Sequence, residues 1–468
     1  MAVINKNDKL KLKISAMTSD GRGIARTDTD FVIFVNHAIP GDLVNAVIKR
    51  KGRNFAEASI TDIVEVSPYR ILPECSHFGI CNGCKLQNTK YEYQLELKRQ
   101  NVKDAFERIG GFIDQPIPDV IGSDNTYFYR NKIEFSFSNN RWLTIEDLHA
   151  NVTDKHFALG FHMPNYIDKV LDITKCYLQS DASNKILNFT RDFFKIRNET
   201  IYSTKTHTGY LRYLVIRQSS TTNEILVNLI TSYENNELIR EYSEFLKKEI
   251  PLVTTLVNSV STIKAQVAQG DFSVTIFGDD YITECIDYFK FKITPGSFFQ
   301  TNSLQTKKLF DYIIKLANFS KNDEVLDLYC GAGAISIFIS ASVDHVTGVE
   351  LSDESIVNAR ENCELNQIKN CEFISFDVKD YLRSLINSES KRYNIFILDP
   401  PRSGLHPKAI EYINQYKPNK IIYVSCNPST QARDVKLLSE KYNITAIQPV
   451  DMFPQTFHIE NIVRLGLK

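Results

Sequence analysis

Hydrophobic and polar residues alternate in short runs over the first 66 residues of the chain. Four such runs occupy residues 11–17, 31–38, 42–50 and 56–66, with glycine- and proline-containing turn sequences between them. Several short strands at this spacing are typical of a small β-barrel. The pattern therefore predicts a barrel over residues 1–66; the alternative is a basic β-hairpin packed on the rest of the protein.

The middle of the chain changes from a helical pattern to a mixed one. At residues 91–111 apolar positions recur at helical spacing, and Gly110 and Gly111 end the run. Residues 125–290 alternate strand-like runs with one or two helices, which is typical of an α+β domain. We expect this central domain to include residues 67–90 as well.

From about residue 291 apolar strands alternate with helices. The strand runs are residues 324–330, 345–350, 394–401 and 420–426. Apolar strands in this arrangement are covered on both faces, so the fold class is α/β with a mostly parallel, doubly wound, Rossmann-like sheet. We assign residues 91–124 and 291–468 to this last domain.

Composition indicates a folded protein outside the membrane. Hydrophobic residues make up 43% of the 468 residues, which excludes wholesale disorder. The longest apolar stretch, near residues 334–343, is about half as long as the roughly 20 residues that a membrane helix needs. The start of the chain has no apolar signal segment. We therefore expect a cytoplasmic protein, and a monomer.

Charge is distributed unevenly along the chain. The net charge is −1, yet residues 1–60 contain ten Lys or Arg and only six Asp or Glu. The basic stretch Lys49, Arg50, Lys51 and Arg53 would contact nucleic-acid phosphates without reading their sequence. A solvated run of surface charge is the alternative.

A glycine loop at the start of the last domain indicates a nucleoside site. Gly331 and Gly333 lie between an apolar strand and a helix, and Glu350 closes the next strand, 19 residues after Gly331. An acidic residue at that distance suits two ribose hydroxyls. The full G-x-G-x-x-G pattern is absent, which disfavours a pyrophosphate cofactor, although a glycine turn also serves tight packing.

Reactive side chains follow two later strands. Asp399 ends one strand and Cys426 the next, with Asn427 placed to cap a helix. A thiol before a helix N-terminus has a lowered pKa, which favours thiolate; the alternative is a buried cysteine in the core. His458 and Glu460 are two residues apart, so on a strand both would project into the same cleft. A solvated surface pair is the alternative.

Three cysteines gather within ten residues near the start of the central domain. The chain has nine cysteines and no signal segment, which argues against a disulfide framework. Cys75, Cys81 and Cys84 supply three soft ligands, and a fourth must come from elsewhere. Four thiolates are compatible with zinc or with a [4Fe–4S] cluster.

Three segments together resemble the RNA uracil-5-methyltransferase family. They are DPPRSG at residues 399–404, IIYVSCNPST at 421–430 and DMFPQTFHIE at 451–460, and the family's P-x-x-F-x-Q-x-N is present at 295–302. The resemblance covers the whole chain. It implies transfer of a methyl group from S-adenosylmethionine to C5 of a uridine, with Cys426 as nucleophile, Glu460 as base and Asp399 as a hydrogen-bond acceptor.

The same resemblance implies the remaining contacts. Phe298 would contact the target base, and Cys176 would complete a [4Fe–4S] site. The barrel resembles a TRAM domain, and TRAM plus cluster is similar to the 23S ribosomal RNA branch, with tRNA as the alternative. Some relatives have a polar residue where this chain has Ala334. The residues implied to line the cofactor pocket are Gln300, Tyr329, Gly331, Glu350, Asp377 and Asp399.

Two rival classes fit the residues less well. Exocyclic-amine methyltransferases have an aromatic residue where this chain has Arg402, and they need no cysteine. A non-enzymatic RNA-binding or iron–sulfur protein would have a degraded cofactor loop or would lack the thiol, and both are intact here.

Overall fold

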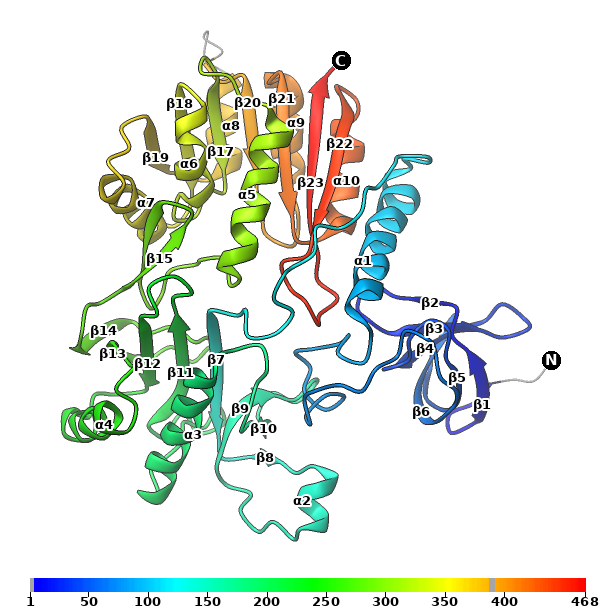
Figure 1. Ribbon diagram of the computed structural model, residues 1–468, viewed down its shortest axis with the longest axis vertical. Helices are drawn as coiled ribbons and strands as arrows, with labels where there is room; N and C mark the ends of the chain where they lie inside the picture. The colour runs from blue at the N-terminus through cyan, green and yellow to red at the C-terminus, as the bar shows by residue number, and fades with distance from the viewer. Residues whose placement is uncertain (1–3, 387–391) are drawn as a thin grey trace.

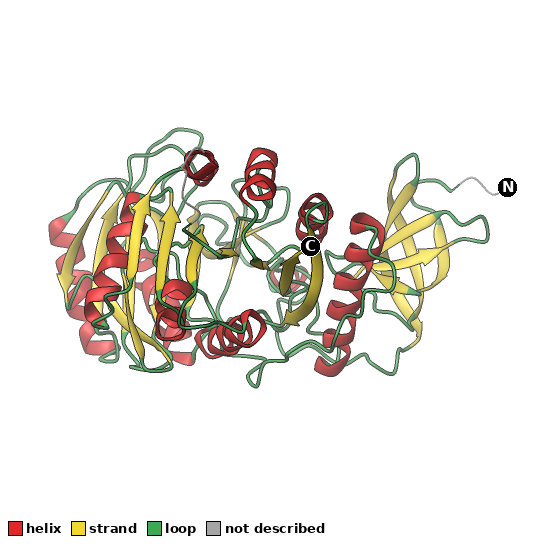
Figure 2. Cartoon of the chain, turned by 90° about the horizontal axis from the view of Figure 1, so that it is seen from above, coloured by secondary structure: helices red, strands yellow, loops and turns green. Residues whose placement is uncertain are grey.

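The structure is a computed structural model that describes residues 4–386 and 392–468. Three large β-sheets organise it, and the chain passes through them in order from the N-terminus (Figure 1). Figures 1 and 2 both show the N-terminal sheet at one end of the molecule, apart from the other two. No helix in the described part of the chain is long and apolar enough to cross a membrane.

The first sheet has six short strands and curves around its own core. Its order is β1-β5-β6-β4-β3-β2, and its interior is filled by small and β-branched residues such as Ala25, Ile33 and Val44. The run at residues 11–17 spans parts of two strands, and residues 23–26 form a strand that the pattern did not indicate. The strands are β1 (Lys9–Lys13), β2 (Ala16–Met17), β3 (Gly23–Arg26), β4 (Val32–Asn36), β5 (Leu43–Lys51) and β6 (Phe55–Glu65).

Helix α1 (Tyr91–Ala105) extends as one π-helical turn (Phe106–Gly110) and ends at Gly111. Gly111 has a φ of 79°, the left-handed conformation that glycine adopts most easily. The helix predicted over residues 91–111 is therefore confirmed. It packs against α10 (Pro428–Leu438) of the last sheet.

The central sheet has the order β14-β13-β12-β11-β7-β9-β10-β8. Helices α3 (Asp181–Ile196) and α4 (Asn236–Glu249) supply apolar residues to its core, and the one-turn helix α2 (Ile145–His149) buries none of its side chains. Its strands are β7 (Lys132–Ser138), β8 (Arg141–Trp142), β9 (Ala158–His162), β10 (Val170–Asp172), β11 (Leu211–Gln218), β12 (Ile225–Thr231), β13 (Thr255–Val260) and β14 (Phe272–Phe277).

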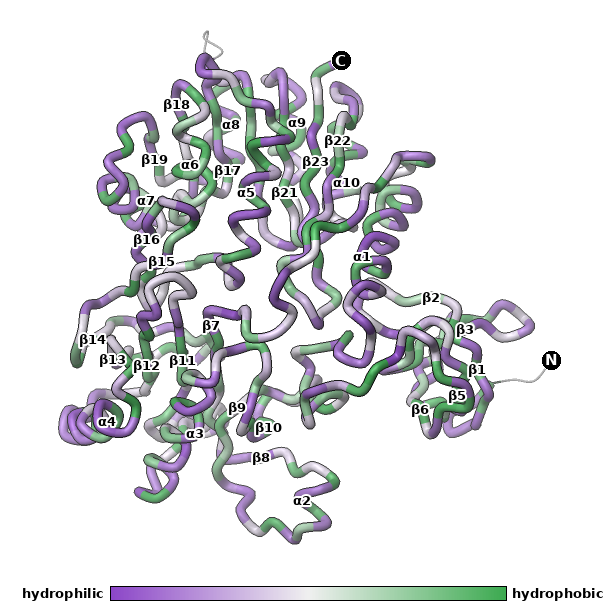
Figure 3. The backbone as a smooth tube through the Cα atoms, in the orientation of Figure 1, coloured by the Kyte–Doolittle hydropathy of each residue, from purple (hydrophilic) through white to green (hydrophobic). Residues whose placement is uncertain are grey.

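The C-terminal sheet has the order β19-β18-β17-β20-β21-β23-β22; six of its strands run in one direction, and β23 runs against its two neighbours. Successive residues of β17 enter different cores: Val325 packs with α5 to α7, and Leu326 packs with α8 to α10. Figure 3 shows these strands as the apolar centre of the domain. The predicted α/β class and the doubly wound sheet are confirmed. The exact domain boundaries stay a prediction.

The bounds of the remaining elements complete this description. The strands are β15 (Ile282–Ile286), β16 (Phe289–Ile293), β17 (Glu324–Leu328), β18 (His345–Glu350), β19 (Cys371–Ser375), β20 (Ile395–Leu398), β21 (Lys420–Ser425), β22 (Tyr442–Val450) and β23 (Glu460–Leu467). The helices are α5 (Ser303–Ala317), α6 (Ala334–Ile339), α7 (Asp353–Leu365), α8 (Val378–Ile386) and α9 (Pro407–Tyr416).

Candidate active site

A cavity of about 740 Å³ opens at the carboxyl ends of the parallel strands. This is the edge at which open α/β sheets bind ligands. Loops that follow β17, β18, β20 and β21 contribute its walls, together with the segment before α5. All of the candidate residues for catalysis and cofactor binding line it: Phe298, Gln300, Tyr329, Gly331, Glu350, Asp377, Asp399, Cys426 and Glu460.

The glycine loop leaves room for a ligand beside the backbone. Gly331 has a φ of 53°, and no atom lies within 4 Å of the position that a Cβ would take there. The Glu350 carboxylate accepts hydrogen bonds from the N–H of Gly331 at 3.3 Å and of Leu351 at 2.8 Å. An open backbone beside a fixed carboxylate fits a cofactor that carries a ribose.

Asp327, on β17, bonds to α6 and so holds the two ends of this glycine loop together. One of its carboxylate oxygens accepts a hydrogen bond from the Ser336 hydroxyl of α6 at 2.6 Å, and the other is buried without a partner among the described residues. Burial raises the pKa of Asp327 to about 7, against the opposing effect of the Ser336 bond. Between about pH 4 and pH 7 the folded protein therefore holds a proton here that the unfolded chain has released.

Cys426 immediately follows β21, in front of α10. Asn427 caps that helix by accepting a hydrogen bond from Ser429 N–H at 3.1 Å, and Pro428 occupies the first helical position. Burial and the neighbouring Glu460 raise the pKa of the Cys426 thiol to about 11, although Arg402 opposes them. The prediction of a lowered pKa was wrong, because burial and two facing carboxyl groups outweigh the helix dipole.

The two carboxyl groups beside Cys426 favour their protonated forms. Burial raises the pKa of Asp399 to about 7, and the Asp327 carboxyl adds to that shift. Burial and Asp399 raise the pKa of Glu460 well above its ordinary value, with Arg402 opposing. Carboxyl groups with raised pKa values take up and release protons near neutral pH, which suits acid–base chemistry.

Arg402 lies beside both Cys426 and His458, a position that the sequence pattern did not reveal. The Arg402 guanidinium lies 3.4 Å from Nδ1 of His458, and it lowers the pKa of Cys426. Burial and Arg402 lower the pKa of His458 to about 4, so the imidazole is neutral. The position of Arg402, three residues after Asp399, was the available signal for it.

His458 and Glu460 do not share a cleft. Glu460 lines the cavity with Cys426, whereas His458 lines a second cavity of about 570 Å³. The expectation rested on strand alternation, but β23 begins at Glu460 and residue 458 lies in the loop before it. The two cavities share a wall made of Phe298, Phe299, Gln300, Arg402 and Phe453.

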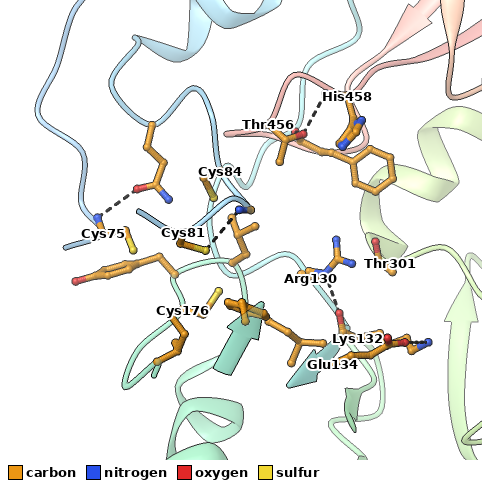
Figure 4. A pocket seen from close by; sticks show the side chains of 18 of the residues that line it. Cys75, Cys81, Cys84, Arg130, Lys132, Glu134, Cys176, Thr301, Thr456 and His458 are labelled. Carbon is orange, nitrogen blue, oxygen red and sulfur yellow. Dashed lines mark hydrogen bonds and ion pairs between the residues drawn. The ribbon is translucent and has the colours of Figure 1, made fainter. Parts of the chain in front are cut away.

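The four candidate ligand cysteines line this second cavity. Figure 4 shows the sulfur atoms of Cys75, Cys81, Cys84 and Cys176 gathered on one side of it. All four are free thiols, and burial raises the pKa of Cys81 to about 11 and of Cys84 to about 12. Within residues 4–386 and 392–468 no group of three or more His, Cys, Asp or Glu is arranged to hold one metal ion.

The basic stretch lies away from both cavities. Lys49, Arg50, Lys51 and Arg53 are exposed at the end of β5 and in the turn that follows. Arg50 lies 3.8 Å from the carboxylate of Glu57 on β6, which also pairs with Arg22 at 3.4 Å. These residues form a charged outer surface of the barrel.

Comparison with known proteins agrees with this geometry. Residues 90–468 match the family model described as tRNA (uracil-5-)-methyltransferase, and residues 6–61 match the TRAM domain. A protein of Bacteroides thetaiotaomicron described as an RNA methyltransferase is 41% identical over 97% of this chain and all of its own length. A similarly described protein of Chlorobaculum tepidum is 38% identical, over 98% of this chain and 96% of its own.

A solved structure has the same arrangement of the chain. The tRNA (uracil-54, C5)-methyltransferase of Pyrococcus abyssi, in complex with S-adenosyl-L-homocysteine, is 28% identical. The match covers 97% of this chain and 100% of that one, with a TM-score of 0.74.

Together the fold and the site define an S-adenosylmethionine-dependent RNA methyltransferase with an N-terminal TRAM domain. More closely, the chain belongs to the tRNA (uracil-5-)-methyltransferase family.

Proposed function

We propose that this protein methylates C5 of a uridine in RNA through a covalent adduct between Cys426 and C6 of the base. The observation that carries the proposal is one cavity in which a thiol, two carboxyl groups and an open glycine loop face each other. C5 of uracil is a weak nucleophile, so a methyltransferase must activate it before it can accept a methyl group.

In this mechanism Cys426 is the nucleophile and Glu460 is the base. The thiol loses its proton to solvent and Sγ bonds to C6, which makes C5 nucleophilic. Bound S-adenosylmethionine supplies the methyl group that C5 takes up. Glu460 then removes the C5 proton, the C5–C6 double bond re-forms, and the Sγ–C6 bond breaks. A carboxylate with a raised pKa is a stronger base once ionised, which suits a weakly acidic C5 proton.

Arg402 and Asp399 assist these steps. Arg402 stabilises the thiolate, because its charge and its hydrogen bond to the sulfur both lower the pKa of Cys426. Asp399 accepts a hydrogen bond between cofactor and target base. Gln300, Tyr329, Glu350 and Asp377 hold the cofactor, and the exposed ring of Phe298, 70% accessible, contacts the target base.

We propose 23S ribosomal RNA as the first substrate, on the resemblance of the TRAM and cysteine combination to that branch. The second candidate is tRNA. The Pyrococcus abyssi enzyme acts on uracil 54 of tRNA, and its whole chain matches this one, so an N-terminal barrel does not by itself distinguish the two substrates. A cytoplasmic location and a monomeric state are part of the proposal.

We also propose that Cys75, Cys81, Cys84 and Cys176 hold a [4Fe–4S] cluster. The supporting observation is the common cavity that all four line. We assign the cluster a structural role: the three cysteines before α1 and the one after β10 come from distant segments, and shared ligation would fix them together.

Covalent trapping tests the mechanism. With RNA that contains 5-fluorouridine, the wild type should form an adduct stable to denaturation, because no C5 proton can leave. Cys426→Ala should abolish both turnover and trapping, whereas Cys285→Ala, outside the cavity, should change neither. Glu460→Gln should accumulate the adduct on ordinary RNA. Turnover by Cys426→Ala would refute the thiol mechanism.

The substrate is tested separately. Nucleoside mass spectrometry with site mapping on a strain that lacks the gene should show loss of 5-methyluridine from large-subunit ribosomal RNA. Loss from tRNA instead would select the second candidate and leave the chemistry intact.

A further inference from the structure

A third cavity, of about 720 Å³, lies where the barrel meets the rest of the protein. Barrel loops around Arg22 and His37, the cysteine loop at Lys85 and Phe457 of the C-terminal loop form part of it. The central domain adds the segment from Trp142 to Leu148 and the pair Met163 and Pro164. It shares no lining residue with the methyl-transfer cavity, and it shares Cys81 alone with the cysteine-lined one. Its other lining residues have no part in the functions assigned above.

The barrel loop is packed closely against the floor of this cavity. Gly21 has a φ of 82°, and a Cβ there would lie 3.0 Å from Cβ of Lys85 and 3.7 Å from Cβ of Phe457. Phe457 stacks beside His458, with ring centroids 4.1 Å apart. Through these contacts the third cavity borders the loop that leads to Glu460.

One wall is aromatic and apolar, and its two aliphatic residues are largely exposed. Trp142, the single tryptophan of the chain, lines the cavity and has Tyr166 beside it, with ring centroids 5.4 Å apart. Lys169 Nζ lies 5.2 Å from the centroid of the Trp142 ring and adds a cation beside it. Ile145 and Leu148 of α2 also line it, yet they are 67% and 59% exposed. Figure 3 shows α2 and its flanking loops extending from the edge of the molecule. Exposed apolar groups that line a hollow are typical of a binding surface.

The opposite wall is cationic and continues into the basic stretch. Arg22 and Lys85 line the cavity, and the one carboxylate among its lining residues, Asp20, is paired with Arg22 at 2.8 Å. Glu57 accepts ion pairs from Arg22 and from Arg50, which joins this wall to the exposed basic surface of the barrel. Cations on this wall and on the basic surface are the groups that nucleic-acid phosphates contact.

We propose that the third cavity binds an unpaired nucleobase of the RNA substrate, stacked on Trp142, while Arg22 and Lys85 contact the adjoining phosphates. An aromatic face beside cations is the arrangement that single-stranded nucleic acid requires. The inference rests on the proposed function, and it adds a site on the RNA away from the uridine that is methylated.

Trp142 also supplies the assay, because the emission of a single tryptophan reports this cavity alone. Titration with the single-stranded oligonucleotide decauridylate should quench the emission saturably, whereas a decamer with the same sugar–phosphate chain and no bases should not. Equal quenching by both oligomers would mean that only phosphates bind there, and would overturn the proposal. Unchanged emission at RNA concentrations that saturate methyl transfer would overturn it as well, and would assign the cavity to another partner.

Kinetics provide a second measurement. Trp142→Ala should raise the KM for RNA by roughly tenfold and change kcat by less than twofold, which is the size expected for one lost stacking contact. Tyr233→Ala, an exposed aromatic of the central domain outside the cavity, is the matched control and should change neither constant. If the emission is quenched but no RNA is methylated, the proposed function fails and the nucleobase site stands.

Discussion

The buried ion pair between Lys98 and Asp451 joins α1 to the loop that ends at Glu460. Lys98 Nζ lies 2.6 Å from Asp451 Oδ1, and the two side chains are 1% and 0% exposed. Asp451 also accepts hydrogen bonds from the Tyr91 hydroxyl at 2.9 Å and from Phe453 N–H at 3.0 Å. These contacts hold the start of residues 451–460 in place.

We expect Lys98→Met to lower the free energy of unfolding by about 3–5 kcal/mol, because it leaves a buried carboxylate without its counter-charge. Asp451→Asn should lower the free energy of unfolding by a similar amount, because it leaves the buried Lys98 ammonium without its carboxylate. The double variant should lose less than the sum of the two single losses, since neither charge then remains. Urea unfolding followed by circular dichroism measures all three.

The same helix supplies a matched control. Arg99 and Asp119 also lie 2.6 Å apart, but their side chains are 49% and 93% exposed. Arg99→Met should therefore lower the free energy of unfolding by less than about 1 kcal/mol. Equal losses for Lys98→Met and Arg99→Met, or strictly additive losses in the double variant, would refute the argument that burial makes the Lys98 pair important.

Three further predictions concern the sites. Asp327 has a folded-state pKa of about 7 against an ordinary 3.8, so its contribution to stability is complete below about pH 4 and is lost as the pH rises toward 7. Thermal unfolding should therefore show the stability of Asp327→Asn rising relative to that of the wild type between about pH 4 and pH 7. A stability difference that stays constant over this interval would contradict the raised pKa. Arg402→Gln should slow adduct formation on 5-fluorouridine RNA at pH 7 by about tenfold, for one further unit of thiol pKa. Because the wild-type thiol has a pKa of about 11, this deficit should stay near tenfold up to about pH 10 and shrink only above about pH 11; adduct formation at the wild-type rate at pH 7 would contradict the role given to Arg402. Cys84→Ser should lower the iron bound by anaerobically purified protein, while Cys285→Ala should leave it unchanged; equal iron in all three proteins would argue against the cluster.

The sequence predicts the fold best where periodicity is strong. Continuous apolar runs identify β17, β18, β20 and β21, because strands covered on both faces need apolar residues at every position. Strand β3 (Gly23–Arg26) was missed, since four residues with a glycine at the start give too short a pattern. It pairs with β4 as an antiparallel hairpin, so the partner strand is the run that was predicted at residues 31–38.

The pKa values of the site residues were harder to predict than which residues line the site. Position after a strand placed Asp399 and Cys426 at one edge of the sheet, and the structure brings them into one cavity with Glu460. The pKa of Cys426 depends on burial and on Glu460, which is 34 residues away in the chain, so local helix geometry gave the wrong sign. The separation of His458 from Glu460 followed from the residue at which β23 begins.

The wall shared by the first two cavities has a consequence for the design of inhibitors. Five side chains, Phe298 among them, face the methyl-transfer cavity on one side and the cysteine-lined cavity on the other. A compound anchored in the glycine loop and extended past Phe298 would enter a compartment that methyltransferases without this central sheet do not have. A longer inhibitor would therefore select this enzyme over other methyltransferases through its contacts in the second cavity. It would not need to bind more tightly in the cofactor pocket, which the wider enzyme class shares.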